Sequence, residues 1–385
     1  MAGLRVAVIA GEASGDILGA GLVDAIRVLD PDAEFRGIAG PRMQAVGVDA
    51  LFAADELSVL GLAEVLGRLP RLLKVRRELV AALCEWRPDV YVGIDSPDFN
   101  LPVARKLRGA GMHTVQYVSP TVWAWRPGRV KGIARAVDCV LCLFPFEPSH
   151  YEGSGTDAVF VGHPLADQLV PPGAEERVEL RKSLGLDPDG VVLAVLPGSR
   201  RSELTNLGPA FAGAIGALSR RAGPVPHFIA PMLSDTHAAL FARMCERYAP
   251  GVPVQLVRED SRRVLAAADF VLTKSGTASL EALLLDRPMV VGYRVAPLTA
   301  WILRTFGLLR IRAFAMPNLL AGGDIVPELI QEACTAESLA AAMGTLLDHP
   351  DTAAAQRTAF AALRGVLKAG ASARAAAEVV RVAKV

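Results

Sequence analysis

The sequence predicts an α/β protein built from two Rossmann-like domains that face a central cleft, followed by a helical tail. Short apolar runs alternate with helix-like segments and lead into Gly, Pro, Asp or Ser, which is typical of parallel strands covered by helices. The alternation stops once, at residues 171–176 (PPGAEE), and then begins again. A chain of 385 residues also has room for two cores.

Ten apolar runs are expected to be strands. They are residues 6–10, 34–38, 90–94, 113–118 and 139–143 before the interruption, and residues 191–196, 227–230, 254–256, 270–272 and 289–291 after it. The two domains are therefore expected at residues 1–170 and 171–345. The Ala-rich remainder, residues 346–385, has strong helix propensity and should pack as helices on the body or on a partner subunit.

Charge and cysteine usage argue against several classes of protein. The 41 Lys and Arg residues nearly balance 40 Asp and Glu residues, so no basic excess favours a nucleic-acid partner. Five scattered cysteines favour a reducing, cytoplasmic compartment over a disulfide framework. Because Cys139 and Cys142 lack a second pair at zinc spacing and the six histidines are dispersed, no metal site is predicted.

The hydrophobic content is high, at 52%, but it is not concentrated in a membrane span. Charged residues interrupt even the most apolar stretch, residues 278–320, and no apolar run approaches the ~20 residues that a span needs. The surplus apolar residues therefore belong to buried cores or to a patch that touches lipid without crossing it.

Polar residues follow two predicted strands of the first half, where open α/β sheets bind ligands. Residues 11–16 (GEASGD) open a helix but match neither a P-loop nor a dinucleotide fingerprint, and an ordinary tight turn explains them equally well. Further on, Asp95 stands at a strand tip as a candidate general base, and Asp98 fits a helix cap beside Pro97. The simpler interpretation makes both aspartates caps.

Aromatic residues and a histidine mark two further positions of the first half. Trp123 and Trp125 lie in one predicted loop, where they either line an acceptor pocket or seal a domain edge. His163 lies near the inferred domain edge, where it either lines the cleft or has a structural role.

Two loops of the second half suit a nucleotide. Arg200 and Arg201 follow the predicted strand 191–196, and a guanidinium fork can bind diphosphate oxygens, although an exposed basic turn would look the same. Residues 273–281 (TKSGTASLE) place small residues at a helix start, whose N–H groups and dipole favour pyrophosphate. Glu281, one turn later, can accept hydrogen bonds from ribose hydroxyls.

An amphipathic basic helix is predicted between residues 62 and 77. Its apolar residues are Leu62, Val65, Leu66, Leu69, Leu72 and Leu73, and its basic residues include Arg68, Arg71 and Lys74. Pro70 should kink or divide the helix. The apolar face can rest on anionic lipid, but a helix that faces a core has the same periodicity.

Six blocks, taken in order, resemble lipid-A-disaccharide synthase. They are residues 11–16, 93–100 (GIDSPDFN), 117–126 (YVSPTVWAWR), 197–200 (PGSR), 275–281 (SGTASLE) and 316–320 (MPNLL). The resemblance implies a GT-B fold and an inverting transfer from UDP-2,3-diacylglucosamine to 2,3-diacylglucosamine 1-phosphate, which gives a β-1,6-linked disaccharide phosphate and UDP. It also implies peripheral attachment to the cytoplasmic face of the inner membrane, which raises the expectation that the amphipathic helix meets lipid.

The same resemblance implies residue roles without any cofactor or metal. Asp95 would deprotonate the acceptor hydroxyl, with Asp98 as the competing base. Arg200 or its neighbour Arg201 and the helix start at Ser275, Gly276 and Thr277 would stabilise the departing UDP, and Glu281 would hold its ribose. Glu12, Ser14 and Asn318 match motifs of the family's cleft and would position the sugars.

Two alternatives of other classes remain open at this point. A UDP-N-acetylglucosamine 2-epimerase would share the fold and the nucleotide site but would not need the basic amphipathic helix. A non-catalytic sensor of nucleotide sugars at the membrane would tolerate replacement of Asp95. A homodimer is compatible with either view.

Overall fold

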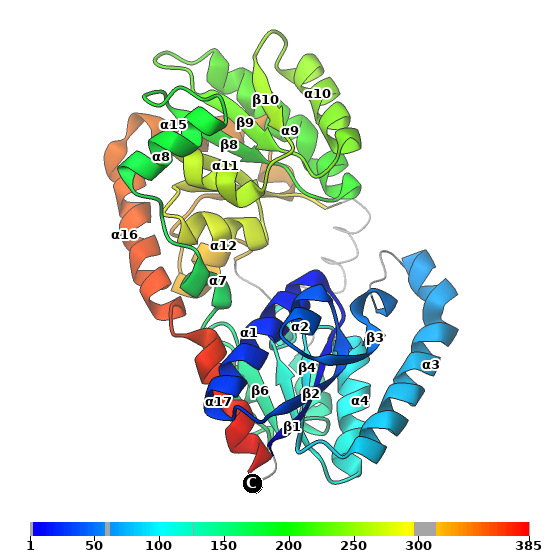
Figure 1. Cartoon of the computed structure of the whole chain (residues 1–385). Helices are drawn as coiled ribbons and strands as arrows, with labels where there is room; N and C mark the ends of the chain where they lie inside the picture. The colour runs from blue at the N-terminus through cyan, green and yellow to red at the C-terminus, as the bar shows by residue number, and fades with distance from the viewer. Residues whose placement is uncertain (1–2, 58–61, 126, 296–312, 385) are drawn as a thin grey trace. The chain divides into compact units, whose positions relative to one another are not determined.

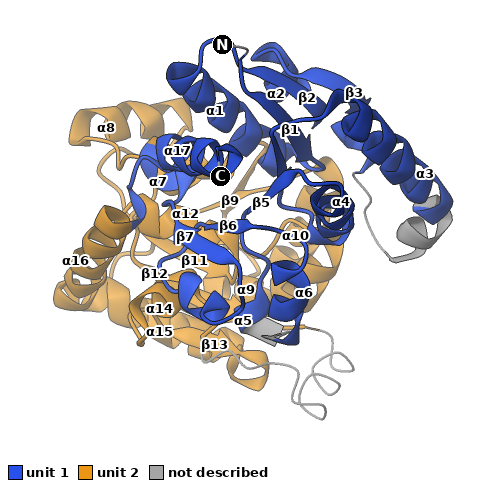
Figure 2. Cartoon of the chain, turned by 90° about the horizontal axis from the view of Figure 1, so that it is seen from below, with its two compact units in different colours: residues 1–167, 367–385 blue, residues 168–366 orange. Residues whose placement is uncertain are grey.

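The computed structural model describes residues 3–57, 62–125, 127–295 and 313–384, without the side chains of residues 62–68, 124, 125 and 127 (Figure 1). The chain forms two compact units (Figure 2). Unit 1 contains residues 1–167 and 367–385, and unit 2 contains residues 168–366. Each unit has a parallel sheet with helices packed against it, so the predicted α/β class with two Rossmann-like domains is confirmed.

Unit 1 is built on a seven-stranded parallel sheet in the order β3-β2-β1-β4-β5-β6-β7. The strands are β1 (Arg5–Ala10), β2 (Glu34–Ala39), β3 (Asp49–Ala53), β4 (Val90–Ile94), β5 (His113–Tyr117), β6 (Cys139–Cys142) and β7 (Asp157–Phe160). The five strands predicted for this part of the chain are all present. The sequence does not predict β3 and β7, which are edge strands without a fully buried residue.

Helices cover both faces of this sheet. They are α1 (Ala13–Leu29), α2 (Pro41–Ala45), α3 (Leu62–Trp86), α4 (Pro97–Gly109), α5 (Val122–Trp125), α6 (Val130–Ala134), α7 (Pro164–Gln168) and α17 (Ala371–Ala383), and three single turns are η1 (Ala54–Glu56), η2 (Pro127–Arg129) and η3 (Pro148–Tyr151). On one face, α1 and α17 bury Leu22 and Val379, and on the other α3 and α4 bury Leu79 and Leu107. Helix α3 continues through Pro70, so this proline does not divide it.

Unit 2 repeats the plan with a six-stranded parallel sheet in the order β10-β9-β8-β11-β12-β13. The strands are β8 (Val192–Leu196), β9 (His227–Pro231), β10 (Val254–Val257), β11 (Phe270–Lys274), β12 (Met289–Tyr293) and β13 (Glu328–Ile330). The helices are α8 (Ala174–Ser183), α9 (Arg201–Ser219), α10 (Asp235–Tyr248), α11 (Ser261–Ala267), α12 (Thr277–Leu284), α14 (Met316–Ala321), α15 (Ala336–Asp348) and α16 (Pro350–Leu367), with a single turn η4 (Gln331–Ala333). All five predicted strands are present, and the short edge strand β13 is additional.

The C-terminal residues are helical, as predicted, but the two units share them. Helix α16 lies almost entirely in unit 2, whereas α17 lies in unit 1 beside α1 (Figures 1 and 2). The backbone N–H groups of Gly370 and Ala371 donate to the Asp167 carboxylate at 3.0 and 2.7 Å, which fixes the start of α17. The sequence places the first domain boundary at residue 170, and the compact units divide after Asp167.

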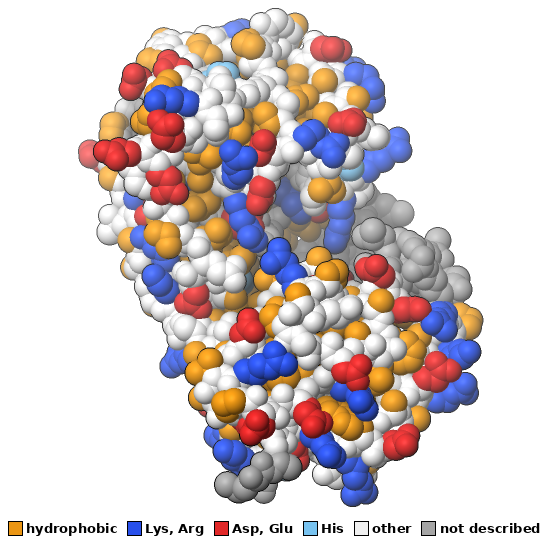
Figure 3. All heavy atoms as spheres, in the orientation of Figure 1, with side chains coloured by type: hydrophobic (Ala, Val, Ile, Leu, Met, Phe, Trp, Pro, Cys, Tyr) orange, Lys and Arg blue, Asp and Glu red, His pale blue; other side chains and the backbone are white. Residues whose placement is uncertain are grey.

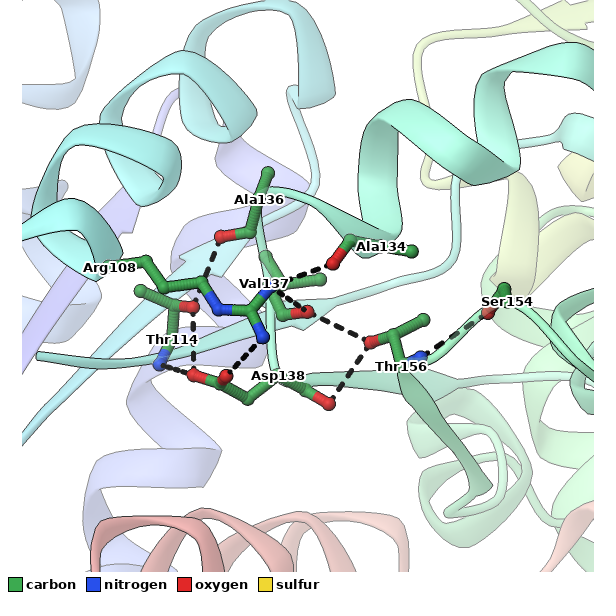
Figure 4. Close-up of polar contacts among 8 residues, drawn as sticks. All are labelled: Arg108, Thr114, Ala134, Ala136, Val137, Asp138, Ser154 and Thr156. Atoms are coloured by element: carbon green, nitrogen blue, oxygen red, sulfur yellow. Dashed lines mark hydrogen bonds and ion pairs between the residues drawn. The ribbon is translucent and has the colours of Figure 1, made fainter. Parts of the chain in front are cut away.

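Polar side chains at the amino edges of both sheets bond to one another. In unit 1, Asp138 pairs with Arg108 at 2.9 Å and accepts from the Thr114 N–H at 2.8 Å (Figure 4). The Thr156 hydroxyl donates to the carbonyls of Val137 and Asp138, so the network ties β5, β6 and β7 together (Figure 4). In unit 2, Asp269 has the same position before β11 and pairs with two arginines of α8, at 2.7 and 2.6 Å. These groups serve the fold.

The visible surface carries both signs of charge on both units. Lys and Arg side chains alternate with Asp and Glu, so no face of a single sign is seen in this view (Figure 3). This agrees with the formal net charge of +1. In the described parts of the chain, no helix combines the length and the apolar character needed to span a membrane.

Candidate functional site

The carboxyl edge of each sheet has a switch point, where the connections that leave two neighbouring strands run in opposite directions along the sheet. In unit 1 this point lies between the neighbouring strands β1 and β4, and in unit 2 between β8 and β11. Open α/β sheets bind ligands outside the strand ends at such points. The predicted motifs at residues 11–16, 95–98, 197–203 and 273–281 all follow these four strands.

Unit 2 has a pocket of about 410 Å³ at its switch point. The lining residues are Leu196, Gly198, Ser199, Pro231, Met232, Leu233, Glu259, Asp260, Ser261, Lys274, Thr277, Ala278 and Glu281. They come from the carboxyl ends of four adjacent strands and from the first turns of α11 and α12. Thr277 and Glu281 are predicted site residues, whereas the sequence did not single out Lys274 or the apolar wall at Met232 and Leu233.

One side of the pocket is formed by Lys274 and by backbone N–H groups at a helix start. Gly276 precedes α12 and has φ +134°, a conformation that favours glycine. Thr277 and Ala278, the first residues of α12, line the pocket, so the helix start faces it. The Lys274 ammonium lies 2.6 Å from Glu203, whose other oxygen accepts from the Ser199 and Arg200 N–H groups. Glu203 therefore fixes the β8 loop and the lysine together.

Glu203, which holds the pocket's lysine, and Glu281, which lines the pocket, have pKa values shifted in opposite directions. Burial acts to raise the pKa of Glu203, but Lys274 and the loop N–H groups outweigh it and hold that pKa below its usual value. Glu281 is only 7% exposed, and burial raises its pKa although Arg262 donates to it at 2.9 Å. Arg262, on α11, was not predicted as a site residue.

The remaining predicted residues of unit 2 differ in their surroundings. Arg200 and Arg201 are both exposed at the start of α9, and neither lines the pocket. The Ser275 hydroxyl donates to the Phe314 carbonyl at 2.6 Å. Asn318 is 2% exposed; its oxygen accepts from the N–H groups of residues 325 and 326, and its amide nitrogen donates to Val326 and Glu328. The structure therefore uses the Asn318 amide to fix its own loop.

At the carboxyl edge of unit 1, the structure brings the motifs after β1 and β4 together. Ala10 and Ile94 are paired residues of the two strands, and a Cβ atom on Gly11 would lie 3.1 Å from the Ser96 hydroxyl. Exposed Glu12 and Ser14 begin α1. These two side chains and Asp95 therefore belong to one edge. Asp16 does not share this role, because its buried carboxylate accepts from three backbone N–H groups at the start of α2.

The two aspartates after β4 differ in their contacts. Asp95 and Ser96 both have positive φ, +51° and +39°, which costs roughly 1 kcal/mol or more for residues with a side chain. The Asp95 carboxylate is partly exposed, and within the described part of the chain no side chain or N–H group bonds to it. Asp98 lies in the first turn of α4 with its side chain 87% exposed, and Arg129 pairs with it at 2.5 Å.

Aromatic side chains gather after β5 and β6. The Trp123 ring meets Phe146 edge-on at 5.3 Å between centroids, and Phe144 lies between Phe146 and His163. Burial lowers the pKa of His163 to about 4, so this imidazole is neutral near pH 7. The sequence does not predict Glu147 as a site residue. Its buried carboxylate accepts from the Leu143 and Phe144 N–H groups, and burial raises its pKa to about 7.

The amphipathic segment is helical, as predicted, because it forms the first half of α3. The side chains of Leu62, Val65, Leu66 and Arg68 lie outside the described residues. Leu69 and Leu73 are 43% and 50% exposed, Leu72 is partly buried, and Arg71 pairs with Glu56 at 2.6 Å. Among the described side chains of α3, Val75 is the first that belongs to the core, so Leu69 and Leu73 are not core residues.

Across the described residues, no group of three or more His, Cys, Asp or Glu side chains is arranged to hold a metal ion. Each unit thus has its own candidate site at the carboxyl edge of its sheet. Unit 1 presents carboxylates, and unit 2 presents a pocket lined by Lys274, a helix start and carboxylates.

Comparison with known proteins identifies the family. The model of the lipid-A-disaccharide synthetase family matches residues 6–379. The chain is 49% identical over 373 residues to the lipid-A-disaccharide synthase of Xanthomonas campestris pv. campestris (strain 8004), covering 97% of this chain and 84% of that protein. It is equally identical, 49% over 373 residues, to that of Xylella fastidiosa (strain M23), covering 97% and 96%.

Solved structures show the fold. The putative UDP-N-acetylglucosamine 2-epimerase of Listeria monocytogenes superposes with a TM-score of 0.65 at 15% identity, covering 100% of this chain and 96% of that one. CalG4, the calicheamicin glycosyltransferase, gives a TM-score of 0.55 at 16% identity, covering 99% and 98%. These likenesses identify the GT-B architecture. The chain belongs to the lipid-A-disaccharide synthase family and is a glycosyltransferase of lipid A biosynthesis.

Proposed function

We propose that this enzyme transfers the diacylated glucosamine of UDP-2,3-diacylglucosamine to the 6-hydroxyl of 2,3-diacylglucosamine 1-phosphate. The anomeric carbon is inverted, and the products are the β-1,6-linked disaccharide 1-phosphate and UDP. The observation that carries the proposal is the 49% identity to lipid-A-disaccharide synthases over 97% of the chain. The pocket of unit 2 and the carboxylates of unit 1 provide the chemistry that such a transfer needs.

The UDP portion of the donor is assigned to the pocket of unit 2. Its volume of about 410 Å³ is in the range of small-molecule sites, ~300–1,000 Å³. The diphosphate would meet the start of α12, Lys274 and the β8 loop, where positive charge offsets the charge that grows on departing UDP. Met232 and Leu233 offer an apolar wall for the uracil ring of UDP, and Glu281 offers a carboxylate for its ribose hydroxyls. Arg200 or Arg201 would add a guanidinium from the exposed rim.

Asp95 is the favoured base in unit 1. Its carboxylate takes the proton of the acceptor hydroxyl while that oxygen bonds to the anomeric carbon and the bond to UDP breaks. The competing candidate, Asp98, already has Arg129 against one oxygen. Glu12 and Ser14, exposed at the start of α1, are proposed to position the sugars.

The membrane contact is assigned to the first half of α3. Leu69 and Leu73 are exposed, and Arg71 and Lys74 lie on the same stretch of helix, a combination that suits an anionic lipid surface. Both substrates carry acyl chains, so an enzyme attached to the cytoplasmic face of the inner membrane would meet them there.

A direct assay tests the proposed reaction. The purified protein is incubated with the acylated donor and acceptor, and the lipid product is weighed by mass spectrometry. We expect a disaccharide phosphate and one UDP for each product molecule, both dependent on acceptor. Epimerised UDP-sugar formed without acceptor would point to the epimerase alternative, and nucleotide-sugar binding without any turnover would point to a sensor.

A further inference from the structure

The backbone at Asp95 is held in a conformation that it would not adopt freely. Asp95 and Ser96 both have left-handed φ angles, and so does Val118, with φ +75°, at the end of the adjacent strand β5. Positive φ is a real outlier for a β-branched residue such as Val118. Three strained residues at two neighbouring strand tips indicate that the surrounding structure enforces the local geometry.

Two buried amides supply that constraint. We infer that Asn100 and Gln116 are positioning residues that clamp the Asp95 backbone and thereby aim its carboxylate, an inference that rests on the proposed role of Asp95 as base. The Asp95 carbonyl accepts from Asn100 Nδ2 at 2.8 Å and from Gln116 Nε2 at 3.0 Å. The Asp95 N–H donates to the Tyr117 carbonyl at 2.9 Å. Hydrogen bonds therefore fix both the backbone N–H and the backbone carbonyl of Asp95.

Asn100 is itself held in one orientation. Its side chain is fully buried, and its Nδ2 also donates to the Ile94 carbonyl at 3.1 Å. The Tyr91 hydroxyl lies 3.2 Å from the Asn100 carbonyl and 3.3 Å from its Oδ1 and can donate to either. Burial raises the pKa of Tyr91, so this hydroxyl keeps its proton. A Cβ atom on Gly93 would lie 2.8 Å from the Asn100 Cβ, so the glycine makes room for the amide.

Gln116 serves both strained strand tips. Besides Asp95, its Nε2 contacts the carbonyls of Tyr117 and Val118, each at 3.3 Å. Its side chain is fully buried, yet its Oε1 has no hydrogen-bond partner among the described residues. A buried amide with an unpaired oxygen is unfavourable. What this glutamine contributes is therefore its N–H groups, and these point at the backbone of the proposed base.

The clamp acts on the carboxylate through the shared Cα atom. When the Asp95 carbonyl and N–H are fixed, the direction of the Cα–Cβ bond is fixed too. Without the two donors, the chain can relax toward negative φ, and the carboxylate then swings away from the sheet edge. A displacement of about 1 Å at a reacting group can reduce turnover by about a hundredfold.

The test uses Gln116→Met and Asn100→Ala in the full-length protein, with Thr114→Val as the matched control. Thr114 is equally buried and lies on the same strand as Gln116, but it bonds at the amino edge. We expect kcat to fall about 10- to 100-fold in the two amide variants, with UDP affinity and the donor KM unchanged. Thr114→Val should lower the unfolding midpoint without a comparable loss of kcat.

Combination with Asp95→Asn separates positioning from a general structural role. A residue that acts through Asp95 has little effect once that carboxylate is gone, so Gln116→Met should not reduce the residual activity of Asp95→Asn further. Equal losses in both backgrounds, or normal kcat in both amide variants, would overturn the inference. Full activity of Asp95→Asn would instead remove the proposed base. Should Gln116→Met fail to fold, Asn100→Ala in the same two backgrounds decides the matter.

Discussion

The carboxyl edges of the two sheets share a topology but differ in which residues have positive φ. At the switch point of unit 2, glycines have positive φ: Gly198 with φ +136° after β8 and Gly276 with φ +134° after β11. At the switch point of unit 1 and the neighbouring strand β5, residues with side chains have positive φ: Asp95 and Ser96 after β4 and Val118 after β5. Glycine lets a backbone approach a diphosphate closely, whereas an acid–base step needs a side chain at the strand tip. Of the two switch points, that of unit 1 therefore carries the backbone strain.

The largest expected effect tests the side chain at the unit 1 edge. Asp95→Asn should reduce disaccharide formation by about 10²- to 10⁴-fold, because the amide cannot accept the hydroxyl proton. UDP binding in unit 2 should persist, as measured by calorimetry. Asp98→Asn is the matched control, and we expect a much smaller loss; the reverse ranking would transfer the role of base to Asp98.

The next effect tests the glycine backbone of unit 2. Gly276→Ala imposes roughly 1–3 kcal/mol of strain, because a residue with Cβ rarely adopts φ +134°, and this should weaken UDP binding by about 10- to 100-fold. The added methyl group has space, since its nearest neighbour is the Lys274 ammonium at 3.7 Å.

Gly251→Ala provides the control for backbone strain alone. Gly251 has φ +76° in the same unit but does not line the pocket. It should lower the unfolding midpoint while leaving the UDP dissociation constant unchanged. Equal UDP affinity in the two variants would mean that the start of α12 does not meet the diphosphate.

A smaller effect asks which unit meets lipid. Leu69→Ser combined with Leu73→Ser removes two exposed apolar side chains from unit 1 and should weaken sedimentation with anionic vesicles by about tenfold. Val225→Ser with Val366→Ser removes two comparably exposed side chains from unit 2, 49% and 51% exposed, and should have no effect. Unchanged sedimentation of the leucine variant would exclude this face as the membrane contact.

The smallest effect compares the pH dependence of stability that one carboxylate near each sheet edge contributes. Burial raises the pKa of Glu147 in unit 1 to about 7 from 4.5, so the folded state binds the proton more tightly than the unfolded state. Stability therefore falls as pH rises from about 4.5 to 7 and is flat above. The unfolding midpoint of the wild type should drop, relative to Glu147→Gln, by a few degrees between pH 5 and 8.

Glu203 in unit 2 has the opposite sign. Its pKa is lowered, so its stabilising contribution is complete above the usual carboxyl range and is lost only as pH falls through the lowered value. The difference between the wild type and Glu203→Gln should thus stay constant from pH 5 to 8. Parallel thermal unfolding at both pH values checks the contrast, and identical trends for the two variants would contradict it.

Sequence patterns predict the central strands well because these strands are buried on both faces and so read as apolar runs. The edge strands β3, β7 and β13 escape prediction because none of their residues is fully buried. At the site, Thr277 and Glu281 follow from a local strand-to-helix motif and do line the pocket. That information is contained in a few consecutive residues.

Contacts distant in sequence explain what the sequence could not predict. Lys274 could not be predicted as a site residue because its partner, Glu203, lies 71 residues away in the sequence. The same holds for Arg262 and its partner Glu281. Asn318 fits a family motif, but whether its amide faces a ligand or its own loop depends on Glu328 and the loop after α14. Neither direction is encoded in a local pattern.

The return of α17 to unit 1 has a consequence for biosynthesis. Its Ala375 and Val379 complete the same core as Leu22 and Ile26 of α1. On the ribosome, α1 is made early, but its covering helix follows only after all of unit 2. The N-terminal layer must therefore remain incomplete, with apolar surface open to chaperones or to misassociation, until residues 371–383 have been made.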